Sequence, residues 1–117
     1  MEVVAKARYV RISPKKLREL RELVLGKEVN YAIDILKNVP KKGSKIYIKT
    51  IKSAVANGNQ KVEGAEWKIK NILVEQGPTY KRYRAAPMGR AVMIRRRTSH
   101  LVVILEEIEG EKYGTKS

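Results

Sequence analysis

The fold is decided by residues 75–106, which read EQGPTYKRYRAAPMGRAVMIRRRTSHLVVILE. The glutamates at the two ends enclose thirty residues that include no acidic side chain. Pro87 and Gly89 supply a turn signal near the middle, and the two halves contain tyrosine, valine and isoleucine, which favour strands. The segment therefore predicts a long β-hairpin, an arm that covers residues 77–100.

The predicted arm carries seven cationic side chains and no carboxylate to pair with them. These charges repel one another unless a polyanion neutralises them, and the interleaved tyrosines can stack on bases. A charge run is more commonly a solvated face or a disordered tail, but the strand-forming residues between the arginines argue against disorder. We interpret the arm as a structure that enters nucleic acid. Its cationic residues are Lys81, Arg82, Arg84, Arg90, Arg95, Arg96 and Arg97.

The whole chain has an excess of positive charge that supports this interpretation. Its 117 residues carry a formal net charge of +14 and the pI is near 10.1, as is typical of nucleic-acid-binding proteins. A membrane is the competing polyanion, but the longest apolar run, Leu101–Leu105, is too short to span a bilayer. The N-terminus lacks the apolar core of a signal peptide and the chain lacks cysteine, so we expect a cytoplasmic protein without disulfides or zinc fingers.

The rest of the sequence predicts a single α+β domain, in which a three-stranded antiparallel sheet packs against three helices. Its body covers residues 1–76 and 99–108, and a polar tail at residues 107–117 is expected to fray. The short basic segment at residues 41–43 is expected to connect the second and third helices. Strands are expected at residues 3–12, 67–74 and 99–106, and helices at residues 14–25, 30–39 and 44–57.

Periodicity also predicts which side chains face the core. In the first strand, strict alternation puts Tyr9 inward and Val10 outward. In the second strand it puts Leu73 on the same face as Trp67, which we expect to be a core residue. In the first helix, Leu23 belongs to the inward stripe with Leu17, Leu20 and Val24.

The start of the first helix has an unusual charge pattern. Ser13 is a suitable N-cap and Pro14 a suitable first residue, but Lys15 and Lys16 occupy a turn where the helix dipole favours acids. This placement makes sense if the backbone N–H groups and the lysines together receive a phosphate. The alternative is that Lys15 pairs with Glu19, and Arg18 with Glu22, as ordinary helix-surface neighbours.

The sequence gives little sign of catalysis. His100 is the sole histidine and has neither a cysteine nor a nearby carboxylate beside it, so packing or a phosphate contact is its expected role. No phosphate loop, paired carboxylate motif or nucleophile elbow is present. We therefore expect a non-enzymatic protein that needs no metal and no cofactor.

Several blocks of sequence occur together in one order. They are ARYVRISPKK at residues 7–16, EQGP at 75–78, KR at 81–82, GRA at 89–91 and RRTSH at 96–100. Together they resemble the ribosomal protein L twenty-two family of the large ribosomal subunit, in its short bacterial form. The resemblance extends over about residues 3–106.

The resemblance implies a body on the large-subunit surface near the exit of the nascent-peptide tunnel, and a hairpin that reaches between rRNA domains. It implies three partners, which are large-subunit rRNA, neighbouring ribosomal proteins and the nascent peptide, and a role in subunit assembly. Hairpin changes in the family are linked to macrolide resistance. The implied tunnel tip is Arg84, Ala85, Ala86, Pro87, Met88, Gly89, Arg90, Ala91 and Val92. Together, the residue pattern and the resemblance predict rRNA contacts at Arg8, Arg11, Ser13, Lys15, Lys16, Arg18, Lys81, Arg82, Arg84, Arg90, Arg95, Arg96, Arg97, Thr98, Ser99 and His100.

The tip departs from the family pattern in one respect. Its order, in which Arg84 precedes Pro87, differs from the more usual order of proline followed by a basic residue. The main alternative function is an architectural DNA-binding protein, because two-stranded arms tipped by proline also kink the minor groove. Such proteins usually present two arms from a dimer, whereas this body is expected to be complete as a monomer. A phosphate-ester enzyme is a weaker alternative, because the basic regions lack a carboxylate or metal cluster.

Overall fold

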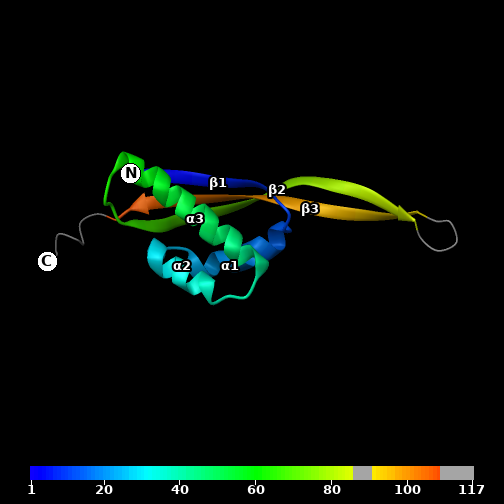
Figure 1. Ribbon diagram of the computed structural model, residues 1–117, viewed down its shortest axis with the longest axis horizontal. Coiled ribbons are helices and arrows are strands. Elements are labelled where there is room, and N and C mark those ends of the chain that lie inside the picture. Colours follow the sequence, from blue (N-terminus) through cyan, green and yellow to red (C-terminus); the bar gives the residue numbers. More distant parts are fainter. Residues whose placement is uncertain (86–90, 109–117) are drawn as a thin grey trace.

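The computed structural model describes the backbone of residues 1–85 and 91–108, and the side chains of residues 1–78 and 97–108. The predicted class is confirmed, because three helices pack against a three-stranded antiparallel sheet with strand order β1-β3-β2 (Figure 1). No helix in this described part of the chain is long and apolar enough to cross a membrane. The elements are β1 (Glu2–Val10), α1 (Pro14–Val24), α2 (Val29–Lys37), α3 (Lys42–Lys61), β2 (Trp67–Ala85) and β3 (Ala91–Glu107).

Strand β3 is the centre of the sheet. It pairs with β1 on one side and with β2 on the other, so Val103 lies between Ala5 and Ile72. Strands β2 and β3 remain paired as far as Ala85 and Ala91. The connecting residues 86–90 lie outside the described part of the chain, so the closed hairpin and its tip stay predictions. The tail at residues 109–117 also lies outside it.

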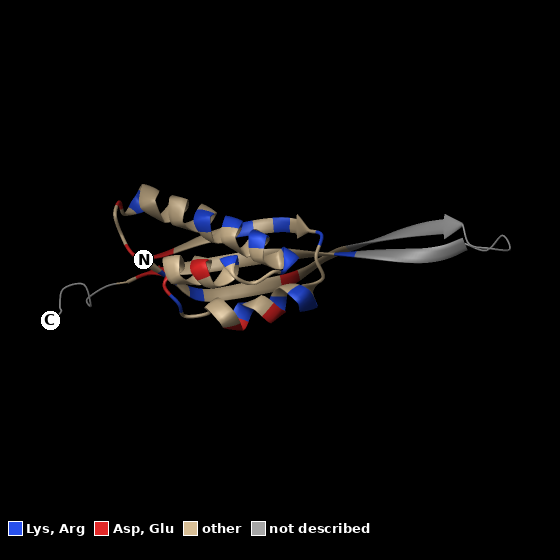
Figure 2. Ribbon diagram, turned by 60° about the horizontal axis from the view of Figure 1, so that its bottom comes forward, with Lys and Arg blue, Asp and Glu red and all other residues tan. Residues whose placement is uncertain are grey.

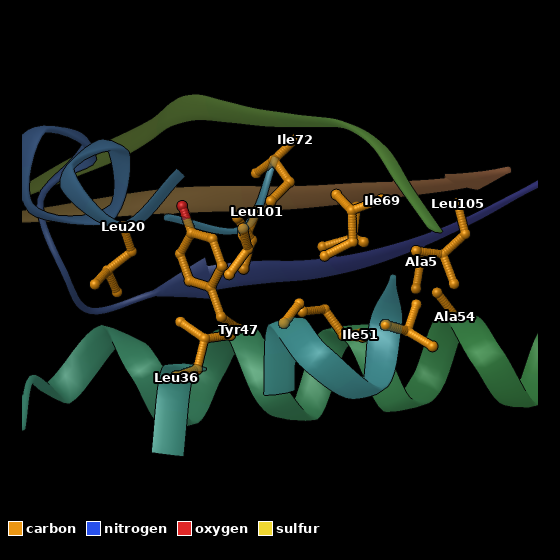
Figure 3. Packing of buried hydrophobic residues seen from close by; sticks show 14 of the residues in the cluster. Ala5, Leu20, Leu36, Tyr47, Ile51, Ala54, Ile69, Ile72, Leu101 and Leu105 are labelled. Carbon is orange, nitrogen blue, oxygen red and sulfur yellow. The ribbon is translucent and has the colours of Figure 1, made fainter. Parts of the chain in front are cut away.

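The hydrophobic core lies between the sheet and α3. Figure 3 shows Tyr47 and Ile51 of α3 directed toward Ile69 and Leu101 of the sheet, and all four are fully buried. Aromatic and branched apolar side chains contribute most to burial energy, so this layer is the main source of stability. The Tyr47 hydroxyl donates a hydrogen bond to the Leu17 carbonyl. Burial raises the pKa of Tyr47 well above its ordinary value, and the positive charge of Arg21 opposes this rise.

Two strand predictions were wrong because each strand contains a register shift. In β1 the shift between Ala7 and Val10 turns Val10 into the core and leaves Tyr9 57% exposed. In β2 the shift between Ile69 and Asn71 buries Ile72 and leaves Leu73 41% exposed. An extra residue in a strand reverses the faces of every side chain beyond it, so strict alternation fails at these points. Trp67 is buried, as predicted.

The helix predictions need three corrections. Leu23 of α1 is 39% exposed rather than inward, so the buried stripe of this helix is narrower than predicted. Lys42 and Gly43 belong to the first turn of α3 rather than to a connector. Gly43 is buried there against Leu20 and Leu17, and this close approach leaves little room for a side chain.

The third correction concerns Gly58, which was predicted to end α3 but lies inside the helix. A Cβ atom at Gly58 would lie 2.5 Å from Cζ2 of the Trp67 ring. Glycine is unfavourable in a helix interior, yet here its missing side chain is what allows the buried indole to pack against α3. The helix therefore continues to Lys61.

Replacing Gly58 with alanine should lower the free energy of unfolding by about 1–3 kcal/mol, because overpacking against a rigid buried ring exceeds the gain in helix propensity. Asn59→Ala, on the exposed face of the same helix, is the control and should change stability little. Urea unfolding of both variants measures the difference. Equal stability of Gly58→Ala and the wild type would show that the ring moves aside without cost.

Candidate nucleic-acid interface

Three consecutive residues of β3 hold together the place where the arm leaves the body. The Thr98 hydroxyl donates to the Pro78 carbonyl at 2.6 Å, and the Ser99 hydroxyl donates to the Ile12 carbonyl at 2.6 Å. The Nδ1 atom of His100 accepts from the Tyr9 backbone N–H at 3.1 Å. These bonds connect β3 to β2, to the β1–α1 turn and to β1. We call this set of residues the arm root.

Beside the arm root, the pairing of β2 with β3 contains a second irregularity. Its register against β3 shifts between Gln76 and Thr79. A Cβ atom at Gly77 would lie 2.5 Å from Oγ1 of Thr98, so only glycine lets β2 approach this closely. The bulge and the Thr98–Pro78 hydrogen bond together fix the direction in which β2 leaves the body.

Helix α1 begins at the predicted residues, and this start lies beside the arm root. The Ser13 hydroxyl accepts a hydrogen bond of 3.4 Å from the Lys16 backbone N–H, and Pro14 is the first helical residue. No acidic side chain lies in this first turn. A recess of about 460 Å³ opens between the starts of α1 and α3. Its basic lining residues are Arg11, Lys16, Lys41 and Lys42.

The alternative of helix-surface pairing in α1 is wrong. Glu19 pairs instead with Lys41 at 3.2 Å, and Glu22 pairs with its neighbour Arg21 at 3.1 Å. Lys15 forms no ion pair with any described residue. The first-turn lysines therefore lack the internal partner that this alternative required.

Helix α1 also holds the outer edge of β2, which the sequence alone did not indicate. Arg18 donates through Nη2 to the Val74 carbonyl at 3.1 Å, and Arg21 donates through Nε to the Ile72 carbonyl at 2.8 Å. Arg21 also reaches the side-chain oxygen of Asn71 at 3.0 Å, at the register shift of β2. Two arginines three residues apart share one face of a helix, and this spacing was the available signal.

The ion pairs of the body leave a group of cations unpaired near the arm root. The pairs that form use Glu2, Glu19, Glu22, Glu75 and Glu106, and their basic partners are Lys70, Lys41, Arg21, Lys6 and Lys68. The hydrogen bond from Lys70 to Glu2, with the charge of that carboxylate, raises the pKa of the lysine. Figure 2 shows basic residues spread over the helices and strands of the body, with acidic residues between some of them. Near the arm root, the exposed cations that form no ion pair with a described residue are Arg8, Arg11, Lys15, Lys16 and Arg97. Other exposed cations of the body that form no ion pair with a described residue are Arg18, Lys27, Lys37, Lys42, Lys45, Lys49, Lys52 and Lys61.

Such a set of cations suits an anionic partner. Within the part of the chain that the structure describes, no group of three or more acidic, histidine or cysteine residues could hold a metal ion. The unpaired cations provide charge-assisted hydrogen-bond donors, and the Lys15 backbone N–H adds one more at the start of α1, where Pro14 has no N–H and Lys16 donates to Ser13. Phosphate is the ligand that these donors fit best.

Comparison with known proteins agrees with this geometry. The sequence model of the family described as Ribosomal protein L22p/L17e matches residues 5–106. The chain belongs to this family. It is therefore a ribosomal protein, and the family suggested by its sequence blocks is confirmed.

Curated relatives from bacteria support the same membership. The chain is 45% identical over 109 residues to "Large ribosomal subunit protein uL22" of Halothermothrix orenii, with 92% of this chain and 96% of the relative covered. The protein of the same name from Pelotomaculum thermopropionicum gives the same identity and coverage. That of Clostridioides difficile is 44% identical over 109 residues, which cover 92% of this chain and 98% of the relative.

The structure places the predicted contact residues of this family member in three groups. Arg8, Arg11, Lys15, Lys16 and Arg97 are exposed around the arm root, whereas Arg18 is exposed but donates to β2. Ser13 caps α1, Thr98 and Ser99 are buried with their hydroxyls bound to backbone carbonyls, and partly buried His100 accepts from Tyr9. We assign these last residues a structural part in the arm root. The side chains of Lys81, Arg82, Arg84, Arg90, Arg95 and Arg96 lie outside the described residues.

Replacing Ser99 with alanine should lower the free energy of unfolding by about 1–3 kcal/mol, because the buried Ile12 carbonyl loses its hydrogen-bond donor. Ser53→Ala, at an exposed position of α3, should leave stability nearly unchanged. Thermal and urea unfolding of the free protein measure both. If the two serine variants were equally stable, the Ser99 hydroxyl would not hold the β1–α1 turn.

Proposed function

We propose that this chain is a structural constituent of the large ribosomal subunit that binds the rRNA of that subunit and supports its assembly. The observation that carries the proposal is the group of unpaired cations around the arm root, at Arg8, Arg11, Lys15, Lys16 and Arg97. Phosphates of a folded RNA would neutralise these charges and release counterions. The relatives named as large-subunit proteins support this choice of partner.

The arm would extend rRNA binding from the body into the interior of the subunit. Strands β2 and β3 stay paired to Ala85 and Ala91, beyond the helices of the body (Figure 1). The register places Arg82 opposite Ile94, and Arg84 opposite Val92, along this ribbon. We propose that the ribbon passes between rRNA segments and that residues 84–92 line the nascent-peptide exit tunnel. The body would then lie at the subunit surface beside neighbouring ribosomal proteins, and the free protein would be a monomer.

Binding to rRNA fragments should depend strongly on salt. If about six to eight cations neutralise phosphates, log affinity should fall with log salt concentration at a slope of roughly −4 to −7. Replacing Lys15 and Lys16 with glutamate should weaken binding and reduce this slope. The free variant should unfold no more easily than the wild type, because acids suit the first turn of α1 better than lysines do.

A control variant with the same change in net charge distinguishes a specific rRNA site from general electrostatic attraction to RNA. Lys37→Glu with Lys61→Glu alters the net charge equally, at exposed positions in the last turns of α2 and α3. This control should weaken binding less than the change at Lys15 and Lys16. A slope near zero for the wild type would overturn rRNA binding, and tighter binding to duplex DNA than to rRNA would favour an architectural DNA-binding protein.

The tip should contribute to tunnel function rather than to folding. Deleting three residues, Ala86 to Met88, should leave the free body as stable as the wild type, because these residues lie beyond the strand pair Ala85–Ala91. Ribosomes that contain the shortened chain should respond differently to tunnel-binding drugs or stalling peptides. Loss of folding in the free variant, or an unchanged response in its ribosomes, would contradict this division of roles.

A further inference from the structure

Tyr9 has an unusual backbone conformation. Its φ angle is +57°, and it is the one non-glycine residue with positive φ among the residues that the structure describes. This left-handed region suits glycine or asparagine, and an aromatic residue there is strained. Such strain persists only where the surroundings enforce it, and it is common at functional sites.

The strain has one local explanation. Tyr9 lies in the register shift of β1 that turns Val10 and Ile12 toward the core. A glycine would serve this bend without strain, so burial of its neighbours does not explain why position 9 carries a large aromatic ring. The ring makes no use of the core either, since Tyr9 is 57% exposed.

His100 fixes the exposed ring in place. Its Nδ1 atom accepts from the Tyr9 backbone N–H at 3.1 Å, which holds the strained residue to the central strand. The two rings also meet at 87°, with centroids 4.9 Å apart, an edge-to-face arrangement that restricts the tyrosine side chain. A partner that binds the ring therefore meets a preorganised surface.

The surroundings select the chemistry of that partner. Arg8 and Arg11 flank Tyr9 in sequence, and Arg97 precedes the Thr98–His100 segment that holds it. All three are exposed and pair with none of the described carboxylates. An aromatic face beside unpaired guanidinium groups matches a nucleotide, which offers a planar base together with a phosphate.

We propose that Tyr9 is a stacking platform for an unpaired base of large-subunit rRNA at the arm root. Arg8, Arg11 and Arg97 contact the neighbouring phosphates, and His100 is a positioning residue that acts through Tyr9. This inference rests on the proposed rRNA-binding function and adds to it a site for a single unstacked base.

Replacing Tyr9 with alanine should weaken binding of wild-type rRNA fragments roughly 5- to 140-fold at fixed salt, which is the range expected for loss of one stacked base. Tyr9→Phe keeps the aromatic face and should bind within about threefold of the wild type on the same physical ground. The slope of log affinity against log salt should stay the same in both variants, because neither changes a charge.

Tyr31 offers a matched control. It is also 57% exposed but lies on α2, where its ring has Lys27 6.0 Å from the centroid. Tyr31→Ala removes the same aromatic surface and should leave rRNA affinity unchanged. An equal loss of affinity at both positions would overturn the stacking site in favour of a general effect of exposed tyrosines.

The variant Tyr9→Gly distinguishes a loss of rRNA binding from a loss of folding stability. Glycine relieves the strain at positive φ, so the thermal midpoint of the free variant should be no lower than that of the wild type. Its rRNA affinity should nevertheless fall as far as that of Tyr9→Ala. Wild-type affinity in Tyr9→Gly would show that the ring has no role in binding and would overturn the inference.

Failure of this inference is distinguishable from failure of the proposed function. If the wild type binds rRNA with the expected salt slope and Tyr9→Ala binds equally well, only the stacking site is wrong. If the wild type shows no salt-dependent binding to rRNA, the proposed function fails and the stacking site fails with it.

Discussion

The buried hydrogen bond from the Ser99 hydroxyl to the Ile12 carbonyl is the constraint on which the rest of this structure depends. It joins the central strand to the turn where β1 becomes α1, so it sets where the N-terminal end of α1 lies relative to the arm. Thr98 and His100, on either side, make the matching bonds to Pro78 and Tyr9. Because side chains alternate along a strand, three successive residues can hold segments that lie on different sides of it. A buried hydroxyl without its acceptor would be costly, so the arrangement is strongly specified.

The distribution of charge follows from the same division of the molecule. Within the described residues, carboxylates such as Glu2 and Glu106 pair across the strands at the end of the sheet far from the arm. Exposed pairs of this kind add little stability, but they neutralise the surface locally. The cations around the arm root receive no such partner, and Glu75, which lies closest, is paired with Lys6. Repulsion among these cations disfavours the free protein and would be relieved by a bound polyanion.

The sequence predicted the number, type and order of the elements because hydrophobic periodicity and capping residues are local signals. Ser13 and Pro14 marked the start of α1 correctly for this reason. The errors lie where tertiary packing overrides a local signal. The register shifts at Tyr9 and Asn71 depend on how β1 and β2 meet β3, and Gly58 continues α3 because Trp67 occupies the space beside it. The grip of Arg18 and Arg21 on β2 was missed because their partners are backbone carbonyls, which carry no signature in the sequence.

Arg18 and Arg21 of α1 donate hydrogen bonds to β2 just before it leaves the body. The orientation of α1 and the direction of the ribbon are therefore coupled. The held stretch runs from Ile72 to Val74, and β2 continues for ten residues beyond it, from Gln76 to Ala85. At about 3.3 Å per residue these ten residues span roughly 33 Å, so a tilt of about 3° at α1 would move their far end by roughly 1.7 Å. A small change in the orientation of α1 would therefore become a larger displacement at the far end of the ribbon.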